Sequence, residues 1–272
     1  MPDEVFSLFT SLRYDVKLRQ VPSRGWAYAG WNNSHESPLY MLDYHRDRIV
    51  RAATYWQWED AIEMLSGDAG LARLENIALQ AIGDAETRPL RVKIVVDKDG
   101  TIQAAKYETP AISVENLFPE RLPAPGSVAG PNDPKIPPRL TLVVDGCLLS
   151  RSEFTHFKTT RRVMYDAARE RANIRPGEMK EVLVINRDDQ SVMEGTTTTP
   201  YFWRDGRWVT PPVAAKFSWE DGSGGQDGTS RRWALERGIA VEQTVPLQSL
   251  VDGEECWLSN GVGGFRRAIL HI

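Results

Sequence analysis

The order of apolar and polar residues predicts strands and helices in the first part of the chain. Strands are predicted, from alternation or from an apolar run, over residues 6–14, 90–96 and 101–107. A turn at Asp97-Lys98-Asp99-Gly100 separates the last two. Apolar residues recur at helical spacing after Asp43, a possible helix cap, and again over residues 71–82, before Gly83. We therefore expect a small N-terminal α/β domain over residues 1–118.

The last part of the chain predicts mainly strands. Apolar runs typical of strands cover residues 140–149, 181–186, 239–244 and 255–258, and a hairpin is expected over residues 201–208 around Asp205-Gly206. Helical spacing covers residues 159–172 and residues 229–237. We assign residues 139–272 to a larger C-terminal domain.

A linker is predicted between these two domains. Residues 119–138 contain seven prolines and two glycines with few apolar residues. Proline lacks the backbone donor that helices and sheets need, so this composition opposes both. The predicted fold class is α+β with two domains.

Composition narrows the class of protein. The chain has 272 residues, 41% hydrophobic and 26% charged, which is enough for two domains that each bury a core. It has neither an apolar run of about 18 residues nor a signal-like start, so we expect a cytoplasmic protein. The net charge is −4 and the cations are scattered, which favours a small-molecule substrate over nucleic acid or a membrane.

The two cysteines carry no metal or redox motif. Cys147 and Cys256 lie in apolar surroundings, without the spacing of zinc ligands or of a redox pair. We expect two buried free thiols and no metal site.

Lys158 is the first candidate for chemistry. It lies between Phe157 and two threonines, just before a predicted helix. Neighbouring aromatic side chains can desolvate an amine, lower its pKa and make it a nucleophile. Taken alone, a solvated lysine at a helix start explains the residue better, because most lysines take no part in chemistry.

Three further segments could bind an anion. Arg48 follows His45 by three residues, so both can face one cleft, and an arginine fork suits phosphate. A glycine-rich loop leads through Gly228, Thr229 and Ser230 into a predicted helix, whose free amides favour anions, although many helices begin this way merely as a cap. The turn at Asn260-Gly261 offers further amides, and a flexible turn explains it nearly as well.

Glu194 follows the strand predicted to end at Asn186. A carboxylate can pair with the protonated ring nitrogen of a pyridine cofactor and keep that ring an electron sink. In isolation Glu194 is an ordinary loop glutamate.

The order of these features resembles that of the class IV, or fold-type IV, pyridoxal-phosphate enzymes. These include branched-chain and D-amino-acid transaminases, (R)-amine transaminases and 4-amino-4-deoxychorismate lyases. The resemblance covers nearly the whole chain, and it implies a small N-terminal domain and a larger C-terminal pseudo-barrel domain. It also implies pyridoxal 5′-phosphate as the cofactor and a homodimer.

The resemblance implies roles for individual residues. Lys158 would be the Schiff-base lysine and Glu194 the partner of the pyridine nitrogen. The phosphate would be held by Arg48 and by the amides of two segments: Gly228, Thr229 and Ser230 in one, Asn260 and Gly261 in the other.

Local motifs lean toward the lyases within this group. Phe9-Thr10-Ser11-Leu12-Arg13 resembles the Phe-Thr-Thr-x-Arg strand of the lyases, where transaminases more often have Phe-Glu or Tyr-Glu. Thr10 would then point a hydroxyl into the substrate pocket as a catalytic residue. The Ser259–Phe265 segment, Arg162 and the hairpin at Phe202-Trp203-Arg204-Asp205-Gly206 also resemble the lyase versions.

Two departures from the family pattern concern the substrate. The asparagine usual after the glutamate is replaced within residues 196–200, and Val163 stands where branched-chain transaminases have a tyrosine.

The resemblance to the lyases implies a 4-amino-4-deoxychorismate lyase of the folate pathway, which eliminates pyruvate to give 4-aminobenzoate. A transaminase for (R)-amines, D-amino acids or branched-chain amino acids is the alternative, and a non-catalytic protein of this fold is the third. Arg91, Lys93 and Lys98 are candidates to bind a substrate carboxylate.

Overall fold

A computed structural model describes residues 5–127, 139–175 and 177–272. Residues 128–138 of the predicted linker lie outside this range. The chain divides into two compact units. Unit 1 comprises residues 1–118 together with two short segments, Phe157–Arg161 and Gly261–Gly263, and unit 2 comprises the rest.

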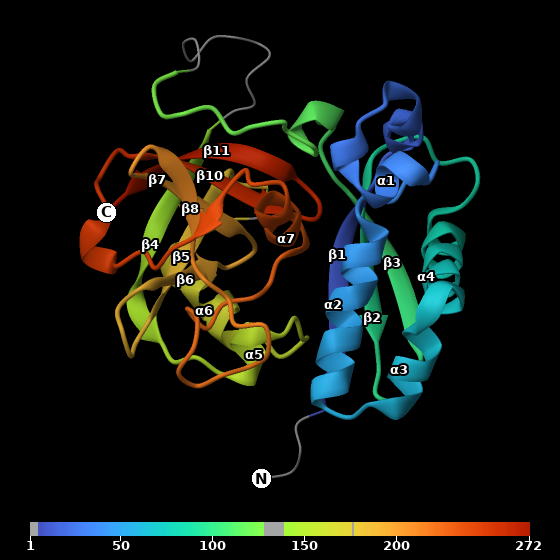
Figure 1. Cartoon of the computed structure of the whole chain (residues 1–272). Helices are drawn as coiled ribbons and strands as arrows, with labels where there is room; N and C mark the ends of the chain where they lie inside the picture. The colour runs from blue at the N-terminus through green and yellow to red at the C-terminus, as the bar shows by residue number, and fades with distance from the viewer. Residues whose placement is uncertain (1–4, 128–138, 176) are drawn as a thin grey trace. The chain divides into compact units, whose positions relative to one another are not determined.

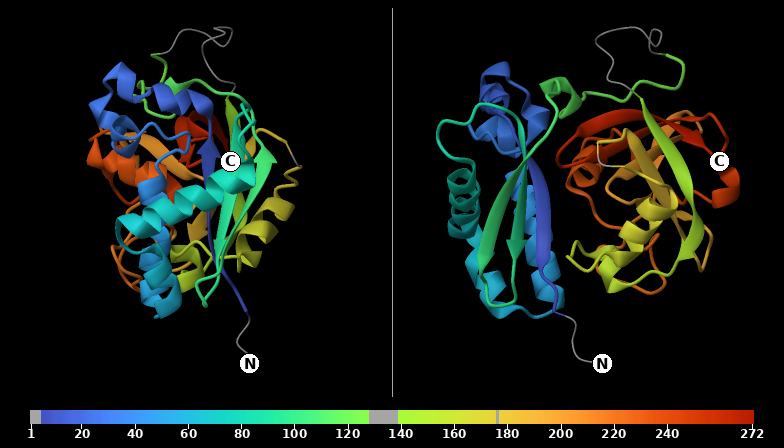
Figure 2. Two further views of the ribbon diagram at one scale, coloured as in Figure 1. Left: turned by 90° about the vertical axis from the view of Figure 1, so that its right-hand side faces the viewer. Right: turned by 180° about the vertical axis from the view of Figure 1, so that it is seen from behind.

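Unit 1 is a three-stranded antiparallel sheet with helices on one face (Figures 1 and 2). Its strands, in sheet order, are β1 (Leu8–Tyr14), β2 (Leu90–Val96) and β3 (Ile102–Glu108). Its α-helices are α1 (Trp31–Ser34), α2 (Leu42–Tyr55), α3 (Glu59–Leu65) and α4 (Gly67–Ile82). Short 3-10 helices are η1 (Val16–Gln20), η2 (Pro22–Arg24), η3 (Ala27–Ala29) and η4 (Val114–Asn116).

The apolar pattern of unit 1 explains this arrangement. Every second residue of β2 is buried, beginning with Leu90, because alternate side chains of a strand face the same side. Helix α4 buries every fourth residue from Gly70 to Ile82, and α2 buries His45, Ile49, Ala52 and Ala53. These stripes cover the buried face of the sheet.

Unit 2 is an eight-stranded mixed sheet that curls into a half barrel (Figure 1). The strands, in sheet order, are β6 (Val192–Gly195), β5 (Lys180–Asn186), β4 (Leu140–Leu149), β11 (Gly264–His271), β10 (Glu255–Asn260), β7 (Thr199–Arg204), β8 (Arg207–Thr210) and β9 (Val241–Glu242). The helices are α5 (Glu153–His156), α6 (Val163–Arg171), α7 (Thr229–Glu236) and the 3-10 helix η5 (Leu247–Ser249).

Strand β5 of unit 2 is buried on both faces. Leu183 and Ile185 belong to the core within the curl of the sheet, whereas Val182 and Val184 pack with Tyr165 of α6. A strand covered on both sides has a continuous apolar run, which is why this segment lacks alternation. Helices α5 and α6 form the crossover between the parallel strands β4 and β5.

Several local predictions are wrong. The helix expected from residue 159 begins only at Val163, because the chain before it pairs as a strand with β1. The strand expected over residues 239–244 shrinks to β9. Cys147 is exposed, since a register shift in β4 between Val144 and Leu148 disrupts the pairing around it, whereas Cys256 is buried as expected.

No helix among the described residues is long and apolar enough to cross a membrane. No group of three or more histidine, cysteine or acidic side chains among them is arranged to hold a metal ion.

Candidate active site

The segment that carries Lys158 forms short antiparallel pairing with β1 of unit 1. The Phe9 amide donates to the Lys158 carbonyl at 3.1 Å, and the Thr160 amide donates to the Ser7 carbonyl at 2.9 Å. The Lys158 ammonium lies 4.9 Å from the centroid of the Phe9 ring, and the Lys93 ammonium lies 5.1 Å from the same centroid. Two lysine side chains thus reach one aromatic ring, an arrangement that cation–π attraction favours.

Aromatic side chains fix the start of this segment. Phe157, which precedes Lys158, packs at 4.8 Å from Tyr55 and 5.0 Å from Trp56, measured between ring centroids. Phe6 packs in turn on Trp56 at 5.0 Å. The flanking aromatic residue singled out in the sequence therefore anchors the lysine segment to the end of α2.

Thr10, His45 and Arg48 form a polar cluster inside unit 1. Thr10 and His45 are fully buried, and the Thr10 hydroxyl lies 2.5 Å from His45 Nδ1 and 2.5 Å from Arg48 Nη2, which donates to it. Burial and the nearby charges of Arg48 and Lys158 hold the pKa of His45 well below its usual value. The expected sharing of one face by His45 and Arg48 is confirmed. A catalytic role for Thr10 stays a prediction, and its hydroxyl is engaged by both side chains.

The turn after β10 also belongs to unit 1. The Arg13 amide donates to the Gly261 carbonyl at 2.8 Å, and Arg13 is itself buried against Asp15, with an ion-pair distance of 2.8 Å. A Cβ atom on Gly261 would lie 2.5 Å from His45 Cε1 and 3.0 Å from the Ser11 carbonyl oxygen. Only glycine lets the backbone approach the histidine so closely.

Glu194 lies on strand β6 of unit 2, not in a loop as its sequence context suggests. Its side chain is buried, and the Tyr165 hydroxyl donates to its Oε1. The glycine-rich loop runs alongside, since a Cβ on Gly225 would lie 2.7 Å from the Met193 carbonyl oxygen. Tyr165 was not predicted from the sequence, because its position on the face of α6 that meets β5 is also that of an ordinary core residue.

The predicted anion-binding amides of Gly228, Thr229 and Ser230 lie at the start of α7. Gly228 is the N-cap, and Thr229 and Ser230 are buried. The Ser230 hydroxyl lies 2.8 Å from that of Ser259 on β10, which lies 2.9 Å from the Tyr201 hydroxyl. This chain of hydroxyls ties the start of α7 to the strand that ends at Asn260, and burial raises the pKa of Tyr201, so its phenol stays protonated.

The loop after Glu194 is held by one buried carboxylate. Glu181 on β5 accepts hydrogen bonds from three consecutive hydroxyls, those of Thr196, Thr197 and Thr198, and from the Thr197 amide. Asn260 Nδ2 donates to the Thr197 carbonyl at 3.3 Å. This loop is where the family's usual asparagine is replaced.

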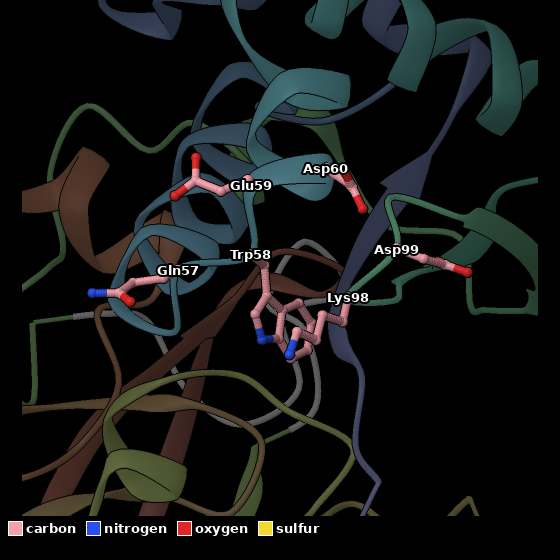
Figure 3. Close-up of a pocket in the computed structure, with 6 residues that line it drawn as sticks. All are labelled: Gln57, Trp58, Glu59, Asp60, Lys98 and Asp99. Atoms are coloured by element: carbon pink, nitrogen blue, oxygen red, sulfur yellow. The ribbon is translucent and has the colours of Figure 1, made fainter.

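The structure therefore sorts the predicted site residues into two groups. Unit 1 holds Thr10, Arg48, Lys158 and Gly261, and unit 2 holds Glu194, Gly228, Thr229, Ser230 and Asn260. A hollow of about 400 Å³ in unit 1 contains none of them (Figure 3). Trp58 and Lys98 contribute to that hollow, while the carboxylates of Asp60 and Asp99 point away from the indole in the close-up. Lys98, considered for a substrate carboxylate, thus lines a separate hollow.

The residues present fit pyridoxal phosphate on chemical grounds. A lysine amine held by backbone pairing suits a covalent bond to an aldehyde, and a buried carboxylate that accepts from a tyrosine suits a pyridinium. An arginine, the start of a helix and a glycine turn that excludes any side chain suit a phosphate. The chain thus contains donors and acceptors of the kinds that this cofactor needs.

The fold defines the class of protein: a two-domain, fold-type IV enzyme with a small α/β unit and a larger half barrel. The sequence also identifies the protein family. Residues 30–269 match the model of the class IV amino-transferase family, and the chain belongs to this family. The predicted family and fold class are confirmed, and the cofactor of the family is pyridoxal 5′-phosphate.

Solved structures of the same fold include proteins of differing activity. A proposed amino-acid aminotransferase from Mesorhizobium loti is 19% identical, with a TM-score of 0.63 and coverage of 97% of this chain and 99% of that one. A proposed 4-amino-4-deoxychorismate lyase is also 19% identical (TM-score 0.59; 97% and 84% covered). The branched-chain amino acid aminotransferase of Escherichia coli is 16% identical (TM-score 0.59; 97% and 77% covered). No curated protein matches in sequence.

Proposed function

We propose that the protein is a pyridoxal-phosphate-dependent 4-amino-4-deoxychorismate lyase that releases 4-aminobenzoate and pyruvate. The observation that carries this proposal is the Phe9-Thr10 stretch of β1. Phe9 lies under both Lys158 and Lys93, and Thr10 contacts Arg48 and His45. The substrate carries two carboxylates, so a second lysine beside the covalent one suits it. Threonine in place of glutamate at residue 10 is the lyase-like choice.

When bound, the cofactor would supply an electron sink for the substrate carbon that bears the amino nitrogen. The substrate amine would take the place of Lys158 in the covalent bond, and the freed Lys158 Nζ takes the proton from that ring carbon. The electron pair completes the aromatic ring, and the bond between the ring and the enolpyruvyl oxygen breaks. Lys158, directly or through the Thr10 hydroxyl, returns the proton to the methylene carbon of the departing enolpyruvyl group, which becomes the methyl group of pyruvate. All atoms of the substrate appear in 4-aminobenzoate and pyruvate, so no keto acid is consumed.

In this proposal the cofactor is held by the residues that the family resemblance implies. Lys158 would bind it covalently, Glu194 would accept the proton of its ring nitrogen, and Arg48 would pair with its phosphate. Amides of Gly228, Thr229, Ser230, Asn260 and Gly261 would complete the phosphate contacts. Lys93 is our candidate for a substrate carboxylate, and the homodimer stays a prediction.

A transaminase is the second candidate, and the family match is compatible with either activity. The same Lys158 would then move a proton between two carbons, and the reaction would need a keto acid as acceptor. An (R)-amine substrate without a carboxylate would leave Lys93 without a role.

The decisive experiment compares both reactions in one preparation of holoenzyme. With aminodeoxychorismate alone, we expect 4-aminobenzoate and pyruvate in equal amounts, measured by chromatography. In parallel, the enzyme receives an (R)-amine, a D-amino acid or a branched-chain amino acid, each with and without pyruvate or 2-oxoglutarate. Keto-acid-dependent amine consumption, with no 4-aminobenzoate formed, would replace the lyase with the transaminase.

A further inference from the structure

Tyr165 of α6 makes a buried hydrogen bond to Glu194. Its side chain is 1% exposed, and its hydroxyl donates to Glu194 Oε1. The same hydroxyl lies 3.2 Å from the Thr155 carbonyl oxygen and accepts from Gln226 Nε2 at 3.4 Å. One phenol thus connects α5, α6, β6 and the glycine-rich loop within unit 2.

The proton of this contact belongs to the tyrosine. Burial and the neighbouring Glu194 carboxylate raise the pKa of Tyr165 well above its usual value, so the phenol stays protonated. A phenol that donates to a carboxylate stabilises the ionised form of that carboxylate. This favours the charged form of Glu194 against the cost of its burial.

Other charged groups fix the phenol and the loop beyond Glu194. The Arg162 guanidinium lies 5.2 Å from the centroid of the Tyr165 ring and donates to the Thr196 carbonyl at 3.1 Å. Arg169 lies 3.6 Å from Glu181, the carboxylate that binds the loop after Glu194. Asp227, next to Gln226 in the chain, lies 3.3 Å from Arg231. Among these side chains, Tyr165 donates directly to the Glu194 carboxylate.

We propose that Tyr165 is a positioning residue that keeps Glu194 ionised and oriented, and that it thereby sets the acid–base behaviour of the bound cofactor. The inference rests on the proposed role of Glu194 toward the pyridine nitrogen and holds for a lyase or a transaminase. A protonated ring nitrogen places a positive charge near the bond to Lys158 and disfavours a second proton there. Weakening Glu194 therefore raises the pH at which the cofactor-bound lysine nitrogen loses its proton.

The test is a pH titration of the visible absorption band of the reconstituted holoenzyme, without substrate. Tyr165→Phe removes only the hydroxyl, and we expect it to raise the midpoint by about one pH unit. Glu194→Gln should raise the midpoint further. Tyr40→Phe is the matched control, because Tyr40 is an equally buried phenol that donates to the Leu117 carbonyl instead of a carboxylate, and the midpoint of this variant should equal that of the wild type.

A second substitution separates hydrogen bonding from packing. Tyr165→3-fluorotyrosine keeps the ring and hydroxyl but makes the phenol a stronger donor, so the midpoint should fall below that of the wild type. A merely structural role would leave it unchanged. If Tyr165→Phe does not fold, as judged by circular dichroism, the fluorinated variant alone decides.

The outcomes distinguish this inference from the proposed function. A shifted midpoint in Glu194→Gln, with wild-type midpoints in both Tyr165 variants, would overturn the role of Tyr165 alone. A wild-type midpoint in Glu194→Gln would overturn the assignment of Glu194 itself, and the inference with it.

Discussion

In unit 1, backbone pairing positions the candidate residues Lys158 and Gly261, whereas in unit 2 side chains that bind one another position Glu194 and Ser230. In unit 1, amides and carbonyls of β1 hold the segments that carry Lys158 and Gly261. In unit 2, a tyrosine holds Glu194 and a chain of hydroxyls holds the start of α7. The two groups should therefore respond differently to substitution.

The comparison explains where each unit can tolerate change. A backbone hydrogen bond survives most substitutions of the residue that makes it, so only residues of special geometry or chemistry are restricted in unit 1. A hydrogen bond between side chains is lost when either partner is replaced, and a buried partner is then left unsatisfied. Unit 2 should accordingly be more sensitive at residues that never contact the cofactor.

Loss of Lys158 should have the largest effect. Lys158→Ala removes the covalent anchor and the proton carrier, and we expect activity to fall by roughly 10⁴-fold, because a positioned acid–base group contributes up to about that factor. Borohydride reduction followed by mass spectrometry should show no cofactor attached to the protein. Lys93→Ala is the matched control, since Lys93 lies over the same ring and should leave the attachment intact. Attachment at Lys93 in the first variant would contradict the assignment.

Substitution of Gly261 tests the backbone side of the comparison. In Gly261→Ala the new methyl group would collide with His45 and with the Ser11 carbonyl, and we expect unfolding free energy to fall by about 1–3 kcal/mol. Chemical denaturation measures this loss. Gly146→Ala, where a Cβ meets nothing within 4 Å, should change stability far less. Equal effects of the two variants would show that the turn and the histidine are not packed as described.

The pH dependence of stability gives the smallest expected effect. His45 has a lowered pKa in the folded state, so the unfolded chain binds more protons as pH falls below the ordinary value of 6.5. Stability should be fully present above that pH and fall on acidification, by up to about 1.4 kcal/mol per pH unit from this residue. Denaturation at several pH values should show a shallower slope for His45→Gln. His35→Gln, at an exposed histidine, should retain the wild-type slope.

The sequence predicted the elements whose burial follows a simple period. The bounds of β2 and β4 are those that the pattern predicts. Helix α4 ends before Gly83, as predicted. Helix α3 and strand β6 were missed because seven and four residues are too short to show a period. Strand β11 was missed because its pattern includes Arg266 and Arg267, and Arg267 is buried by pairing with Glu255 at 2.6 Å.

The candidate site was predictable only as far as residue type and order carry information. Lys158, Arg48 and Glu194 became candidates because the order of these features along the chain resembles that of the family. Tyr165 did not, since its partner lies 29 positions away and nothing local distinguishes it from a core tyrosine. The contact between Gly261 and His45 joins distant segments in the same way.

Glu181 limits how the sequence of the loop after Glu194 can change. The loop after Glu194 takes its shape from a carboxylate one strand away, and three hydroxyl groups share that acceptor. Losing one hydroxyl leaves the other two in place, so single changes within the threonine run are buffered. Losing the carboxylate removes all three at once, and later changes in the run would then be nearly silent. The loop thus has several hydrogen-bond donors that can replace one another but a single acceptor. In related sequences we expect substitutions at residues 196–198 and no change at Glu181.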